Sequence, residues 1–125
     1  MPYTLEWQRD RGLVKVTHFG DVTTDEIQDS LNDVERDRGQ ADRPCLLVDL
    51  RDTATYPNIA DLLLFAESNC HRPRVAAKTA FIYNGQTAEA VDFVVLAASN
   101  RGYFVEAFAE EDLAIDWLFC GSSAP

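Results

Sequence analysis

The segment from Cys45 to Leu50 constrains the fold of this chain more than any other part of the sequence. It reads Cys-Leu-Leu-Val-Asp-Leu, a nearly continuous apolar run followed by a polar stretch. A short run of this kind is typical of a strand that is covered on both faces, as the central strands of parallel sheets are. We therefore predict an α/β domain with this hexapeptide in the interior of the sheet.

Strands and helices are predicted to alternate along the rest of the chain. Residues 3–9 and 13–19 have strand character around a polar turn, and we expect an antiparallel hairpin. Further strands are expected over 75–83 and 103–109, and helices over 24–38, over 59–69, after Thr87 and after residues 110–112. Strands joined by single helices run parallel, so the order β-β-α-β-α-β-α-β-α predicts a mixed, mostly parallel open sheet.

Length and charge limit the classes of protein to consider. At 125 residues the chain has the size of one domain, which we place at residues 1–120, with residues 121–125 as a flexible tail. The formal net charge of −10 disfavours nucleic acid and anionic membrane surfaces as partners. No apolar run is long enough to span a bilayer, and the N-terminus lacks the regions of a signal peptide, so we expect a cytoplasmic protein.

Familiar catalytic and metal-binding motifs are missing from the sequence. Three widely spaced cysteines, Cys45, Cys70 and Cys120, fit neither a disulfide framework nor a zinc site, so we interpret them as free thiols. There is no Gly-x-Ser-x-Gly elbow and no glycine-rich phosphate loop. We expect no cofactor and no bound metal, and we consider an enzyme less plausible than a binding domain.

The first predicted helix carries a row of acidic side chains at four-residue spacing. The row includes Asp25, Asp29 and Asp33, and like charges at this spacing repel one another by a few tenths of a kcal/mol per pair. The simpler interpretation is a solvated helix face, helped by the helix dipole and by nearby arginines. The alternative is a docking face for a basic protein partner.

Four segments together resemble a known group of domains. They are the opening strand Tyr3–Trp7, the helix start Val22–Ile27, the strand and loop Leu47–Asp52, and the ending Ala114–Leu118. In this combination the chain resembles the SpoIIAA-like domains, small bacterial domains related to the STAS anti-sigma-factor antagonists and similar in topology to CRAL-TRIO lipid-binding domains. The resemblance implies a SpoIIAA-like fold and a regulatory role.

The resemblance also implies a phosphorylation site in the loop after the central strand. The STAS antagonists carry a serine there, whereas the corresponding stretch of this chain has none. Thr53 and Thr55 are the candidate phosphoacceptors that remain. Phosphate on either would add about two negative charges near a helix N-terminus.

A polar rim is predicted at the carboxyl ends of the parallel strands, where open α/β sheets bind ligands. The predicted rim residues are Asp49, Arg51, Asp52, Thr53, Thr55, Tyr56, Tyr83 and Asn84. Asp49 and Asp52 are either structural carboxylates, with hydrogen bonds to backbone or to Arg51, or a pair that holds a metal or acts as acid and base.

Two further features carry open alternatives. His18 has no partner nearby in the sequence, and we expect a half-buried strand residue rather than a catalytic base. Several aromatic residues either fill the core or line a lipid-sized cavity: Trp7, Phe65, Phe93, Tyr103, Phe104 and Trp117.

Our leading hypothesis from the sequence is a non-enzymatic regulatory or protein-interaction domain that presents the rim or the acidic helix to a protein partner. The alternative is a carrier of a small apolar, lipid-like ligand in a pocket between sheet and helices. A weaker alternative is a metal-dependent enzyme that uses Asp49 and Asp52. Exposed edge strands and an apolar final helix make a homodimer plausible.

Overall fold

The computed structural model describes residues 3–69 and 75–119, so the predicted tail at 121–125 lies outside the described residues, as do Cys70 and Cys120. The five strands are β1 (Tyr3–Gln8), β2 (Leu13–Asp21), β3 (Cys45–Thr55), β4 (Lys78–Ile82) and β5 (Val105–Phe108). The helices are α1 (Thr24–Arg38), α2 (Ile59–Asn69), α3 (Ala88–Asn100) and α4 (Glu111–Phe119), with a short 3-10 helix at Arg9–Arg11. No helix among these residues is long and apolar enough to cross a membrane.

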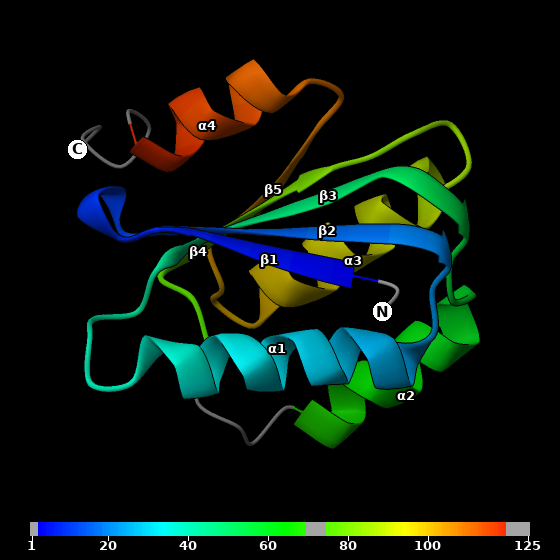
Figure 1. Cartoon of the computed structure of the whole chain (residues 1–125). Coiled ribbons are helices and arrows are strands. Elements are labelled where there is room, and N and C mark those ends of the chain that lie inside the picture. Colours follow the sequence, from blue (N-terminus) through cyan, green and yellow to red (C-terminus); the bar gives the residue numbers. More distant parts are fainter. Residues whose placement is uncertain (1–2, 70–74, 120–125) are drawn as a thin grey trace.

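The strands form one sheet in the order β1-β2-β3-β4-β5 (Figure 1). β1 pairs with β2 in an antiparallel hairpin, and all other neighbours are parallel. The predicted fold class, a mixed and mostly parallel α/β sheet with an N-terminal hairpin, is therefore confirmed. β3 is the middle strand, and the residues from Leu46 to Leu50 are all buried, as the apolar run predicted.

The sequential strand order determines which face each helix covers. Successive right-handed crossovers in one direction put every crossover helix on the same face of a sheet. Figure 1 accordingly shows α1, α2 and α3 on one side and α4 alone on the other. Two apolar clusters result, one around Val16, Val48 and Val91 beneath the three helices, and one around Leu47 and Leu118 beneath α4.

Helix starts follow from their capping residues. The Thr23 hydroxyl accepts a hydrogen bond of 3.3 Å from the Glu26 backbone N–H, and α1 runs over the residues predicted for it. The Asn58 side chain accepts a hydrogen bond of 2.8 Å from the Asp61 backbone N–H, so this predicted cap of α2 is confirmed as well. Gly12, with φ 64°, closes the hairpin connection in a left-handed conformation that favours glycine.

The limits of the strands differ from those predicted. β3 continues to Thr55, through residues that we predicted to be a loop, because β2 continues beside it after a bulge and pairs Gly20 with Thr53 and Asp21 with Thr55. A polar exposed sequence can remain a strand when its neighbour supplies hydrogen bonds, and sequence periodicity does not report the neighbour. β4 and β5 are shorter than predicted, since only residues 78–82 and 105–108 pair with neighbouring strands.

Candidate functional site

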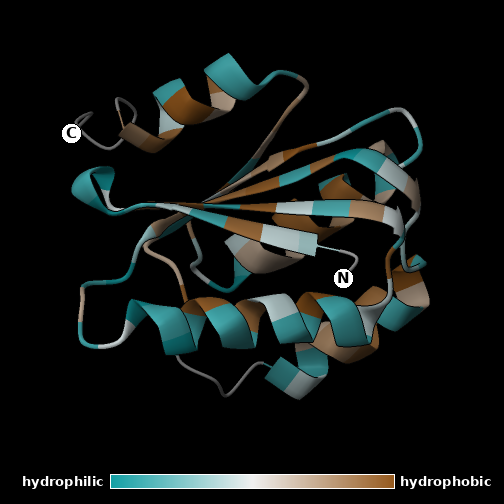
Figure 2. Ribbon diagram, viewed as in Figure 1, coloured by the Kyte–Doolittle hydropathy of each residue, from teal (hydrophilic) through white to brown (hydrophobic). Residues whose placement is uncertain are grey.

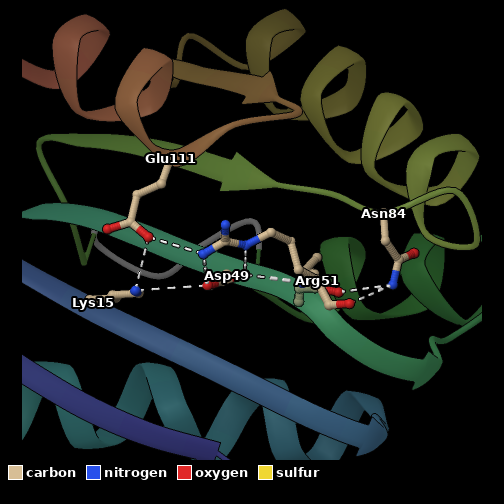
Figure 3. A network of polar contacts seen from close by, with 6 residues as sticks. Lys15, Asp49, Arg51, Asn84 and Glu111 are labelled. Atoms are coloured by element: carbon tan, nitrogen blue, oxygen red, sulfur yellow. Dashed lines mark hydrogen bonds and ion pairs between the residues drawn. The ribbon is translucent and has the colours of Figure 1, made fainter.

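Asp49 was predicted at the end of a strand, but it lies within β3 and is only 5% exposed (Figure 3). Arg51 donates to both of its carboxylate oxygens, from Nε to Oδ1 at 3.0 Å and from Nη2 to Oδ2 at 2.7 Å. The backbone N–H of Arg51 also donates to Oδ1, at 3.0 Å. Burial by itself would raise the pKa of Asp49, but the hydrogen bonds and charge of Arg51, with Lys15, hold it below its ordinary value.

Two residues that were not predicted complete this network. Glu111, at the start of α4, accepts hydrogen bonds of 3.0 Å from both Lys15 Nζ and Arg51 Nη2. Lys15 Nζ also lies 3.8 Å from Asp49 Oδ2. Lys15 lies between two valines in a predicted strand, which was a weak sequence signal for a polar contact at this position. Its partner could not be predicted, because the contact depends on the strand register and on the docking of α4. The network ties three separate elements together with paired charges.

Asn84 braces the other side of the rim (Figure 3). Its amide nitrogen donates to the carbonyl oxygens of Leu50, Arg51 and Thr53 at 3.3, 3.1 and 3.1 Å. Its amide oxygen accepts from the backbone N–H of Thr87 at 2.9 Å, at the start of α3. Asn84 was predicted for the rim, and its amide group links the C-terminal part of β3 to the segment after β4. Both the nitrogen and the oxygen of this amide form hydrogen bonds.

The remaining rim residues do not converge on one site. Thr53 is buried, and its hydroxyl has no hydrogen-bond partner among the described residues, whereas the Thr55 hydroxyl donates to Asp21 at 2.9 Å. Asp52 is exposed, and Tyr83 packs against the apolar cluster under α1 to α3. Residues 51–54 and 84–86 line a shallow open depression. No group of three or more metal-ligating side chains occurs within residues 3–69 and 75–119.

A second space, with mainly apolar walls, lies on the opposite face of the sheet, under the three helices. It is a cavity of about 440 Å³, lined mainly by apolar side chains from the sheet and from α1, α2 and α3. The sheet and the segment before β4 contribute Val16, Leu46, Val48, Val75, Ala76, Phe81 and Val105, and the helices contribute Ile27, Leu31, Leu62, Phe65, Phe93 and Val94.

The helix α2 forms the outer wall of this cavity. It packs against α1 and α3, and Leu62 is its one buried residue among those described. Small side chains face the space, including Ala66 of α2 and Ala97 and Ala98 of α3. Because each of these side chains is a single methyl group, part of the space next to α2 and α3 is left unfilled. Figure 2 shows apolar residues along α2, and three of them are exposed: Ile59, Leu63 and Leu64.

His18 is a buried ionisable group in the cavity wall. It is 2% exposed, where a half-buried residue was predicted, because α1 covers the end of β2. Its Nδ1 lies 3.5 Å from Oε2 of Glu26, and neither atom has a hydrogen bond to a described residue. The Tyr3 ring packs on the imidazole with centroids 5.7 Å apart. Burial lowers the pKa of His18 to about 4, so the ring is neutral at neutral pH.

Tyr56, predicted on the rim, lies instead in the cavity wall. Burial raises the pKa of its hydroxyl. The aromatic residues for which we considered either a core or a cavity position take both positions. Phe65, Phe93 and Tyr103 line the cavity, whereas Trp7 and Trp117 pack against the apolar clusters. Phe104 does neither and is 62% exposed.

The predicted docking residues on α1 are not equivalent. Asp25 and Asp29 are exposed. Asp33 is half-buried, because its carboxylate accepts a hydrogen bond from the Tyr3 hydroxyl and pairs with Arg36 at 3.0 Å. Only the first two therefore present an unshielded acidic surface.

Comparisons with known proteins bear on the fold. No protein family and no curated protein matches the chain. Among solved structures it is similar to an uncharacterised protein of the DUF3478 family from Shewanella loihica PV-4, described as having a SpoIIAA-like fold. The two share 16% sequence identity over 93% of this chain and 91% of the other, with a TM-score of 0.61. The resemblance inferred from the sequence is thus confirmed for the fold: this chain has a SpoIIAA-like fold.

Proposed function

We propose that this protein binds a small apolar molecule in the cavity between its sheet and α1, α2 and α3. The cavity itself is the observation that carries the proposal. Protein interiors pack as densely as organic crystals, and the few voids that they contain are rarely much larger than a water molecule. A space of about 440 Å³ with mainly apolar walls lies instead in the size range of small-molecule sites.

The energetics of an empty cavity support an occupant. Because the space is partly open to solvent, its apolar walls are exposed to water when no ligand is present, and a ligand that covers them gains about 25 cal/mol per Å² of apolar surface removed from water. Water is a poor filler because apolar walls offer it few hydrogen bonds. An apolar ligand would restore the missing contacts.

The volume sets the size of the ligand. At ~30 Å³ for each water-sized group, the cavity holds on the order of 15 such groups. This corresponds to a medium-length aliphatic chain or a compound of two fused rings. In this proposal the protein is a carrier or sensor of such a molecule in the bacterial cytoplasm.

The test is displacement of an apolar fluorescent dye from two matched variants of α2. Ala66 lines the cavity, whereas Ala60 is exposed on the same helix. We expect Ala66→Leu to weaken dye binding at least tenfold and Ala60→Leu to leave it unchanged. Equal binding by both variants, together with native mass spectra that show no ligand in protein purified from cells, would refute the proposal.

A second candidate function is docking of a basic protein partner, as a regulatory domain would require. The exposed carboxylates of Asp25 and Asp29 and the net charge of −10 favour it. The double variant Asp25→Asn, Asp29→Asn should then lose a partner that the matched surface variant Asp92→Asn retains in a pull-down. Retention by both would count against docking at α1. Phosphorylation of Thr55 and formation of a homodimer remain predictions that belong to this second candidate function.

The structure lends less support to a metal-dependent reaction at Asp49 and Asp52. Both carboxylate oxygens of Asp49 are engaged by Arg51, so a metal would have to compete with a paired guanidinium. The arrangement instead ties β2, β3 and α4 together.

A further inference from the structure

The cavity has a distinct polar position where His18 lines its wall, toward the C-terminal end of β2. The His18 side chain is almost fully buried, and no described residue forms a hydrogen bond with its ring. Buried polar groups are nearly always paired, because an unpaired group loses its hydrogen bonds to water without replacement. An unpaired imidazole in the wall of an apolar cavity therefore indicates a ligand that supplies the missing partner.

The surroundings of the ring determine which kind of partner fits. Nδ1 faces the Glu26 carboxyl oxygen at 3.5 Å, and an adjacent carboxylate favours the proton of a neutral imidazole on the nitrogen nearest to it. Nε2 then has a free lone pair and acts as an acceptor. The group that it requires is a hydrogen-bond donor.

The charges near the cavity argue against an anionic ligand. Glu26, next to His18, would repel an anionic head group. The charged side chains that line the cavity within the described residues are Glu35 and Arg101, and both are exposed. A carboxylate group buried beside His18 would thus have no compensating partner there, and its desolvation would be unfavourable.

We propose that the cavity selects apolar molecules that carry a hydroxyl group, and that His18 accepts a hydrogen bond from this hydroxyl. The proposal rests on the function proposed above and specifies the ligand class. A hydroxyl is neutral, donates to an acceptor, and costs little to desolvate compared with an ion. Ligands of this class are aliphatic alcohols and small phenols.

The experiment compares two isomers that differ in one donor. Decanol and methyl nonyl ether have the same atoms and nearly the same shape, but only the alcohol has an O–H group. Each is titrated against the full chain loaded with an apolar fluorescent dye. We expect decanol to displace the dye at roughly tenfold lower concentration than the ether, the effect of one buried hydrogen bond. Decanoate, ionised at neutral pH, should be weaker than decanol.

Two substitutions assign the preference to His18. His18→Phe keeps a ring but removes the acceptor, so it should abolish the preference for the alcohol and leave binding of the ether unchanged. His18→Gln keeps an acceptor at a similar position and should retain much of the preference. The comparison of isomers on the unaltered protein remains decisive if either variant fails to fold.

The outcomes separate this inference from the function on which it rests. Dye displacement by both isomers at equal concentration overturns the role of His18 and leaves apolar binding intact. Tighter binding of decanoate than of decanol also overturns the hydroxyl preference. Absence of any binding of the dye or either isomer refutes both proposals.

Discussion

The two faces of the sheet differ in how their buried polar groups are paired. On the α4 face, Lys15, Asp49, Arg51 and Glu111 pair with one another in a closed network (Figure 3). On the face under α1, α2 and α3, His18 is buried in the wall of an apolar cavity without a hydrogen bond from any described residue. Satisfied polar groups hold a structure, and unsatisfied ones next to a space indicate a ligand. The comparison therefore supports a stabilising role for the network on one face and the proposed ligand binding on the other.

The largest effect that we expect concerns the titration of His18. Its pKa is 6.5 in an unfolded chain and about 4 in the folded protein. Between these values the unfolded state binds the additional proton, so stability falls as the pH is lowered from 6.5 to 4. A difference of 2.5 units at 1.36 kcal/mol per unit corresponds to about 3 kcal/mol.

Urea unfolding at a series of pH values measures this loss. The pKa of Glu26 is raised, mainly by burial, and its titration opposes the effect of His18, so the comparison with His18→Phe isolates the histidine. The variant should lack the His18 contribution to the loss. An identical pH dependence in both proteins would show that His18 titrates as it does in water, and the contrast between the faces would be lost.

The second expected effect tests the closed network. Asp49→Ala leaves Arg51 and Lys15 without their buried counter-ion, and removing one partner of a buried pair costs 3–5 kcal/mol. Because Arg51 is 44% exposed and can be rehydrated, we expect a smaller loss of about 2 kcal/mol. Asp52→Ala, on the same strand but exposed, should change stability by less than about 0.5 kcal/mol.

Denaturant unfolding at neutral pH distinguishes these two variants. Equal stabilities for Asp49→Ala and Asp52→Ala would mean that the network contributes little. The rim would then regain interest as a site for chemistry, because carboxylates that do not stabilise the fold are available for other roles.

Much of the fold followed from patterns that are local in the sequence. The apolar run from Cys45 to Leu50 placed β3 in the middle of the sheet, and Thr23 and Asn58 marked the starts of α1 and α2. The site followed less well, because it depends on contacts between distant residues. Glu111 reaches Arg51 across 60 positions of sequence, and nothing local to either residue indicates the pair.

The cavity was anticipated only as an alternative. Apolar residues that face a cavity have the same sequence period as residues that fill a core, so Phe65 and Phe93 fitted both interpretations. The alanines of α2 and α3 were the available signal, since small side chains on apolar helix faces leave space. Tyr56 was assigned to the rim because the extension of β3 to Thr55 was not foreseen.

The smallest expected effect tests whether the cavity is empty in the purified protein. Ala66→Leu adds three carbon atoms to a wall of the cavity, and filling such a space commonly stabilises a protein by about 1 kcal/mol. The exposed control, Ala60→Leu, should change the free energy of unfolding by less than about 0.5 kcal/mol. Thermal or urea unfolding of protein stripped of ligand measures both.

The same pair of variants gives a different result when a ligand is present. A ligand that binds only the folded state stabilises the unaltered protein by an amount that rises with its concentration. The leucine side chain of Ala66→Leu occupies the space that the ligand needs. The variant should therefore be more stable than the unaltered protein without ligand, and less stable than it once decanol saturates the unaltered protein. A constant difference at all ligand concentrations would place the bound molecule outside the cavity, since side chain and ligand would then not exclude each other.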